Sequence, residues 1–78
     1  MPIELNQERA VLVGVCTVEE AESLLSWVLE HPGAEVDATP CEHLHSAILQ
    51  VLMARRPPLT GLPPDGPLAQ VLRPLATA

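Results

Sequence analysis

The first sixteen residues divide into two apolar segments separated by a polar break. Residues 3–5 alternate apolar and polar side chains, as a half-buried strand does. Residues 6–9 are polar and suit a turn, and residues 10–16 (AVLVGVC) are almost wholly apolar and rich in β-branched side chains. Such a run is typical of a strand buried on both faces. The pattern therefore predicts a hairpin of two strands, at 3–5 and 10–16.

A helix is predicted directly after this apolar strand. Thr17 and Glu20 match a capping box, in which the Thr17 hydroxyl accepts the Glu20 amide and the Glu20 carboxylate reaches back to the Thr17 amide. Helical spacing gives one core-facing stripe, made of Ala21, Leu24, Leu25, Val28 and Leu29. Trp27 falls at the edge of the stripe. Pro32 and Gly33 end the helix.

A second strand-helix unit follows. Residues 34–38 alternate in polarity, which predicts a strand with one solvated face. Residues 39–42 (TPCE) match a second capping box, with proline at the favoured first helical position. Helical spacing then gives a second core stripe, made of Leu44, Ala47, Ile48, Val51 and Leu52. Two arginines and two prolines at 55–58 suit the end of this helix.

The C-terminal third is rich in proline and glycine, which interrupt helices and strands. Residues 57–67 contain five prolines and two glycines, which indicates a looping connector with room for one short strand around 59–62. Pro67 begins a last short helix, whose apolar residues fall on one side: Leu68, Val71, Leu72 and Leu75. Arg73 and Pro74 end its regular part.

Strands that alternate with helices indicate the α/β class. We expect a single domain over residues 1–78, with a small mixed sheet of three to four strands and helices packed mainly on one face. The predicted order is β-β-α-β-α-(β)-α, with right-handed crossovers between parallel strands.

Charge and composition narrow the range of partners. The net charge is −6, and Trp27 is the only aromatic residue, so neither nucleic acid nor an anionic membrane is an expected partner. No apolar run approaches the ~20 residues that span a bilayer. Two cysteines do not make a disulfide framework, and the first residues lack the pattern of a secretion signal. We therefore expect a cytoplasmic protein.

Residues 41–50 contain the largest cluster of side chains that could bind a metal or take part in catalysis. In an extended loop, Cys41, His43 and His45 alternate and could converge on a metal ion; on a helix only Cys41 and His45 would share a face. Zinc needs three or four ligands, so His31 or Asp37 would have to complete the site. The alternative is that backbone groups and water satisfy these side chains. We expect no cofactor and keep metal or small-ligand binding as an alternative.

The same cluster contains the parts of a Cys-His or Ser-His pair. A catalytic pair also needs an orienting group, an oxyanion site and a cleft, and the chain has only four glycines and no glycine-rich loop from which to build them. We therefore expect that the protein is not an enzyme.

The order of elements, together with one segment, resembles the STAS family (sulphate transporter and anti-sigma factor antagonist domains). In that family a strand ending in aspartate leads, eight residues later, into an Asp-Ser-Ser-Gly motif that opens a helix. Here Asp37 stands at the strand position, and His45, Ser46, Ala47 and Ile48 stand at the motif. His45 replaces the aspartate of the motif, and its glycine is absent.

The resemblance implies a STAS-like fold and a cytoplasmic, anti-sigma factor antagonist-like module of bacterial signal transduction. Its partner would be a regulatory protein or a kinase. Ser46 matches the serine that anti-sigma kinases phosphorylate. The family pattern keeps a loop until about His45, whereas the capping box starts the helix at Pro40. We favour the loop, because Cys41 and Leu44 can anchor it.

The predicted second helix is apolar on almost every side. From Ala47 to Ala54 only Gln50 is polar, and Leu49 and Met53 lie off the core stripe. Such a helix either covers a partner or is itself covered, here by residues 57–78. The expected working surface is the loop and helix start at 39–50, and the expected partner-binding residues are His43, His45, Ser46, Leu49, Gln50 and Met53. A structural homodimer through the Leu49 and Met53 face is a further alternative.

Overall fold

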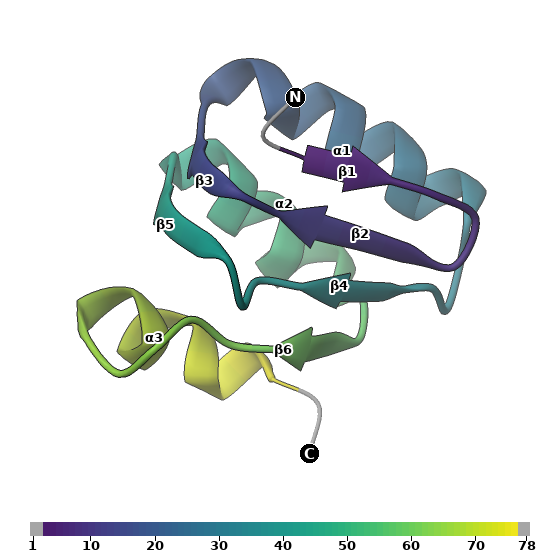
Figure 1. Cartoon of the computed structure of the whole chain (residues 1–78). Coiled ribbons are helices and arrows are strands. Elements are labelled where there is room, and N and C mark those ends of the chain that lie inside the picture. Colours follow the sequence, from purple (N-terminus) through teal and green to yellow (C-terminus); the bar gives the residue numbers. More distant parts are fainter. Residues whose placement is uncertain (1–2, 77–78) are drawn as a thin grey trace.

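The computed structural model describes residues 3–76, so the ends of the predicted domain, 1–2 and 77–78, lie outside the described residues. The described chain is a small α/β protein with three α-helices (Figure 1). Its strands are β1 Ile3–Leu5, β2 Arg9–Leu12, β3 Gly14–Cys16, β4 Glu35–Asp37, β5 Cys41–Leu44 and β6 Leu59–Gly61. Its helices are α1 Val18–Glu30, α2 Ser46–Arg55 and α3 Pro67–Leu72, and a 3₁₀ turn at Arg73–Leu75 follows them.

Two sheets share the strands. A four-stranded mixed sheet has the order β1-β2-β4-β6, in which β1 is antiparallel to β2 and the other pairs are parallel. A two-stranded parallel sheet joins β3 to β5. Because β3 follows β2 and β5 follows β4 along the chain, the second sheet prolongs the central pair of the first. The Gly14 amide donates to the Pro40 carbonyl, at 2.9 Å, where the two sheets meet.

The apolar segment 10–16 is not one strand, as its composition predicts, but two. Gly14 has φ +63°, a left-handed conformation that suits glycine and breaks the regular extension between β2 and β3. The predicted hairpin is confirmed in its first half, with Ile3 opposite Leu12. The observed order, β-β-β-α-β-β-α-β-α, therefore has two strands more than the predicted order with its optional strand.

The helix start predicted at Pro40 is wrong, and residues 41–44 form β5. The Asp37 carboxylate accepts the Thr39 amide at 2.9 Å, which makes a turn where the capping box would be. The chain then runs beside β3, and its ladder ends with the His45 amide donating to the Cys16 carbonyl. Pairing with a strand distant in sequence outweighs the local helix signal. The favoured prediction, a loop until about His45, is closer: the helix begins only at Ser46, although the residues before it form a strand rather than a loop.

The core lies between the sheet and the two long helices, which Figure 1 shows behind the strands. Its largest fully buried side chains include Ile3, Leu12, Leu24, Ile48, Leu52, Leu59 and Leu72. The predicted stripe of the first helix is partly wrong, since Leu25 and Leu29 are 38% and 53% exposed. Trp27 is buried instead, and its indole N–H is satisfied by donating to the Asn6 carbonyl, at 2.6 Å, in the turn between β1 and β2.

The other helix predictions hold in outline. Thr17 precedes α1, but its hydroxyl donates to the Glu20 carboxylate and does not cap a backbone amide. α3 begins at Pro67, and the 3₁₀ turn replaces regular helix at Arg73, as expected. β6 confirms the short strand predicted around 59–62. None of the helices within residues 3–76 has the length and apolar character needed to cross a bilayer.

Candidate functional site

Hydrogen bonds of His45 hold the junction between β5 and α2. His45 caps α2 in an extended conformation, and its Nδ1 accepts the Ala47 amide at 3.0 Å. Its carbonyl accepts the Ile48 amide, and its own amide bonds to the Cys16 carbonyl in β3. An Nδ1 that accepts a hydrogen bond leaves the proton of the neutral ring on Nε2. His45 therefore ties the start of α2 to the end of the two-stranded sheet.

Ser46 is the first residue of α2 and is exposed. It lies on an open groove of about 450 Å³ that three elements enclose. The lining residues are Glu42, His43 and Leu44 from β5, Ser46 and Leu49 from α2, and Pro67, Leu68 and Val71 from α3. The lining is apolar at Leu44 of β5, at Leu49 of α2 and at all three residues of α3. Its polar side chains therefore come only from β5 and the start of α2.

The structure brings together half of the residues predicted to bind a partner. His43, Ser46 and Leu49 line the groove. His45 is exposed next to it, although its Nδ1 is engaged by the helix. Gln50 and Met53 are exposed on α2 but do not line the groove.

The contribution of α3 to the groove is absent from the predicted site. The sequence does carry a signal for it: a six-residue helix with apolar residues at 68, 71 and 72 has more apolar surface than one contact can cover. Leu72 takes the buried position, and Val71 is left 50% exposed at the groove. Glu42 falls within the predicted surface at 39–50 but is not among the expected contact residues, because the capping-box pattern assigns its carboxylate to a helix end.

The structure separates Cys41 from the two histidines. Cys41 is buried, and its thiol donates to the carbonyls of Gly14 and His43, whereas the rings of His43 and His45 are exposed. Burial, with a smaller effect of the nearby Cys16, raises the pKa of the Cys41 thiol to about 12. The thiolate is the form that binds metals and attacks substrates, and it is scarce at neutral pH with such a pKa.

The other residues considered for a metal site do not join the cluster. His31 caps the far end of α1, where its ring stacks on Trp27 at 5.5 Å between centroids. Hydrogen bonds from the Thr39 side chain and backbone lower the pKa of Asp37, which the turn after β4 thus holds as a carboxylate. Within residues 3–76, no group of three His, Cys, Asp or Glu side chains is arranged to hold a metal ion.

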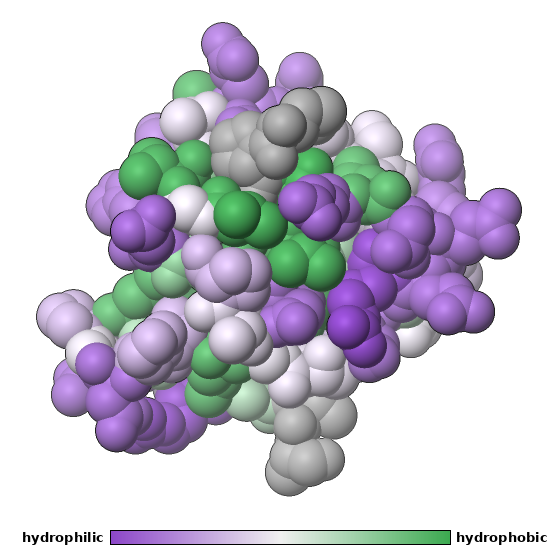
Figure 2. Space-filling model, in the orientation of Figure 1, coloured by the Kyte–Doolittle hydropathy of each residue, from purple (hydrophilic) through white to green (hydrophobic). Residues whose placement is uncertain are grey.

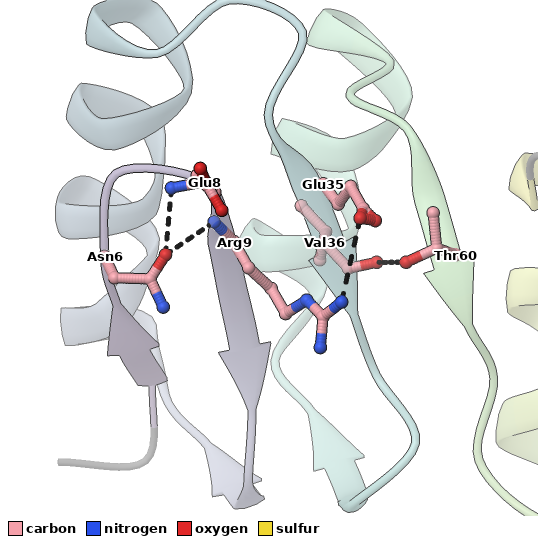
Figure 3. A network of polar contacts seen from close by, with 6 residues as sticks. All are labelled: Asn6, Glu8, Arg9, Glu35, Val36 and Thr60. Carbon is pink, nitrogen blue, oxygen red and sulfur yellow. Dashed lines mark hydrogen bonds and ion pairs between the residues drawn. The ribbon is translucent and has the colours of Figure 1, made fainter.

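The face of the sheet opposite the long helices carries a second group of polar side chains (Figure 3). Asn6 Oδ1 accepts the amides of Glu8 and Arg9, and the Arg9 guanidinium lies 3.7 Å from the Glu35 carboxylate. Both partners of this ion pair are well exposed, so it adds little to stability. Figure 2 shows hydrophobic residues near the centre of this face with hydrophilic ones around them. The ion pair links β2 to β4, the Asn6 bonds are local to the turn before β2, and together they form no enclosed site.

Comparison of the chain with known protein families, with curated proteins and with solved structures finds no match. The geometry of the groove and the β5–α2 junction therefore carries the functional argument.

Proposed function

We propose that the protein is a regulatory interaction module of the STAS type, which binds an apolar segment of a partner protein in the groove between β5, α2 and α3. One observation carries the proposal: Ser46 is exposed at the first residue of α2, on the edge of that groove. Its place, nine residues after the Asp37 that ends β4, matches the spacing on which the resemblance to the family rests.

The residues that line the groove indicate which kind of partner segment would bind there. Leu44, Leu49 and Leu68 are half-buried and offer apolar contact area without being part of the fully buried core. Exposed apolar surface with a polar rim is typical of protein interaction sites. Glu42 is the charged residue of the lining and disfavours an acidic ligand. The occupant is thus an uncharged segment with apolar anchor side chains, from a kinase or another regulatory protein.

Phosphorylation of Ser46 would control this binding. The first turn of α2 has no acidic residue, so a phosphate there would face the uncompensated positive end of the helix dipole. In the bound state the same phosphate would lie beside Glu42 and under an apolar partner. A dianion in an apolar interface next to a carboxylate disrupts it through lost hydration and repulsion. The free protein therefore tolerates the phosphate, whereas the complex does not.

Peptide selection tests the proposal with the whole chain. A random 12-residue phage library would be selected on the protein, and enriched peptides measured by fluorescence anisotropy. We expect apolar peptides whose affinity falls at least about tenfold with Val71→Arg and with Ser46→Asp, a loss of ~1.4 kcal/mol. Both positions are exposed, so these variants should fold.

Two matched controls lie on α1, outside the groove. Leu29→Arg repeats the apolar-to-arginine change at a residue that is 53% exposed, and Ser26→Asp repeats the change at an exposed serine. Both should bind peptide like the wild type. Peptides that bind equally well to Val71→Arg, or a selection without enrichment, would refute the groove as the binding site.

A further inference from the structure

Three side chains of the protein have the length from which a five-membered succinimide ring can close with the next peptide nitrogen. They belong to Asn6, Asp37 and Asp65, which are all the asparagines and aspartates in the sequence. The ring closes readily where the side chain is free to turn toward that nitrogen, where the next residue is small, and where the next amide donates no hydrogen bond. The structure distinguishes the three residues by these requirements.

Backbone amides hold the side chains of Asn6 and Asp37 in place. Asn6 Oδ1 accepts the amides of Glu8 and Arg9, at 2.9 and 2.8 Å. Asp37 Oδ1 accepts the Thr39 amide at 2.9 Å, and the amide that follows Asp37 donates to a carbonyl of β6. Either side chain would have to give up these local bonds before it could reach the next peptide nitrogen.

Asp65 meets all three requirements. It lies in the exposed bend before α3, and its side chain is 97% exposed. Its ion pair with Arg73 joins two exposed side chains, so it restrains the carboxyl group only weakly. The next residue, Gly66, has no side chain to hinder an approach to its nitrogen. Among the residues that the structure describes, the Gly66 amide donates to no acceptor.

We infer that Asp65 is a modification site, at which the aspartate converts to isoaspartate by way of a succinimide. The Gly66 nitrogen forms a bond to Asp65 Cγ, and the hydroxyl of the protonated carboxyl group leaves as water with the amide proton. Water then attacks the main-chain carbonyl carbon of Asp65 and breaks its bond to the Gly66 nitrogen. The backbone thereafter runs through Cγ, and the former main-chain carbonyl is a free carboxylate. One water leaves and one enters, so the mass is unchanged and no other reactant is needed.

The modification reaches the groove through the start of α3. Gly66 caps this helix before Pro67, and its carbonyl accepts the Gln70 amide at 3.1 Å. Isoaspartate adds one methylene group to the backbone directly before the cap. Buried Leu72 holds the other end of α3, so the displacement falls on Pro67 and Leu68, which line the groove. This consequence, unlike the modification itself, rests on the proposed function.

Prolonged incubation of the full chain at physiological temperature and mildly acidic pH tests the modification. Electron-transfer fragmentation of a digest distinguishes isoaspartate from aspartate and locates it. We expect isoaspartate to accumulate at Asp65 and not at Asn6 or Asp37. Gly66→Ala should slow the accumulation severalfold, because a Cβ atom hinders the attack of the nitrogen. Asp65→Glu is the matched control that keeps the charge, and it should abolish the reaction because the larger ring closes poorly.

A parallel incubation in urea tests the contribution of the fold. Asp65 should react at a similar rate in the folded and the unfolded chain. Absence of isoaspartate at Asp65, or a folded chain that reacts far more slowly than the unfolded one, would overturn the inference.

The modified protein, separated by ion exchange, tests the consequence for the groove. It should bind the selected groove peptides severalfold more weakly than the unmodified protein, and equal binding by both would refute the effect on α3. If isoaspartate forms at Asp65 but neither form binds peptide, the proposed function fails and the modification site stands.

Discussion

At the scale of single residues, Gly61 shows how an absent side chain shapes the candidate site. The turn after β4 places the Asp37 carboxylate and the Thr39 hydroxyl over the end of β6. A Cβ atom at Gly61 would overlap Asp37 Oδ1 and lie 2.7 Å from Asp37 Cγ. This turn sets the direction of the chain toward β5 and thus the position of Ser46. The geometry of the groove therefore depends on a residue outside it.

Gly61→Ala should lower the free energy of unfolding by about 1–3 kcal/mol, the usual cost of overpacking. Urea denaturation measures the loss. The control is a double-mutant cycle with Asp37→Ala, which removes the nearest of the clashing atoms. In that background the same glycine substitution should cost clearly less. Equal costs in both backgrounds would show that the overlap with Asp37 is not the cause.

At the scale of elements, the start of α2 depends on two effects that act at different ranges. Long-range pairing with β3 keeps residues 41–44 extended, although their pattern favours helix. Where that pairing stops, His45 supplies the acceptor that a helix N-terminus needs. An imidazole is an unusual cap, since short oxygen-bearing side chains are preferred there. The cap rather than the capping box thus decides where α2 begins.

Removal of this cap gives a test at the same scale. His45→Ala should lower the free energy of unfolding by about 1 kcal/mol, because the Ala47 amide loses its acceptor. His45→Asn, with a preferred capping side chain, should keep the wild-type stability or exceed it. His43→Ala serves as the control in urea denaturation, since that ring is exposed and caps nothing. The same loss in both alanine variants would contradict the role of His45.

At the scale of the whole molecule, the composition allows the titration of the two buried thiols to be observed without that of other side chains in the same pH range. All four basic side chains are arginines, and the chain has no tyrosine. An α-amino group ordinarily titrates near pH 8 and arginine above pH 12, so the cysteines are the side chains that change charge between pH 9 and 12. Burial raises the pKa of both Cys16 and Cys41, in the latter to about 12. The unfolded chain releases these protons at the ordinary value of 9.0.

The sign of the pH dependence follows from these shifts. Above pH 9 the unfolded state binds fewer protons than the native state, so stability falls as pH rises. The contribution of the Cys41 thiol to the free energy of unfolding is complete below pH 9. It is lost progressively as the pH rises to about 12. One such group gives a slope of about 1.4 kcal/mol per pH unit.

Urea denaturation at intervals from pH 8 to 11 measures this slope. Cys41→Ala should reduce it, whatever the variant loses in overall stability. An unchanged slope in that variant would show that Cys41 is not the titrating group.

Local pattern accounts for the elements whose signals agree with their contacts. β4 ends at Asp37 and α3 starts at Pro67, because prolines and alternation of polarity act over a few positions. α1 begins after Thr17 as predicted, although the Thr17 hydroxyl bonds to the Glu20 carboxylate and not to a backbone amide. The α/β class, the hairpin and the exposed Ser46 also follow from such short-range features. Of the site, residues 43, 46 and 49 could be anticipated for this reason.

Contacts between residues distant in sequence determine the remaining features of the fold and the site. Trp27 can be buried with its indole N–H satisfied, since Asn6, twenty-one positions earlier, provides the accepting carbonyl. β5 exists because β3 pairs with it, and the groove exists because α3 returns beside β5 and α2. A short sequence window does not contain both partners of such a contact. The energy of burial and pairing also exceeds the small local preference for helix. Spacing along the chain thus placed Ser46 on the surface, whereas packing in three dimensions built the groove around it.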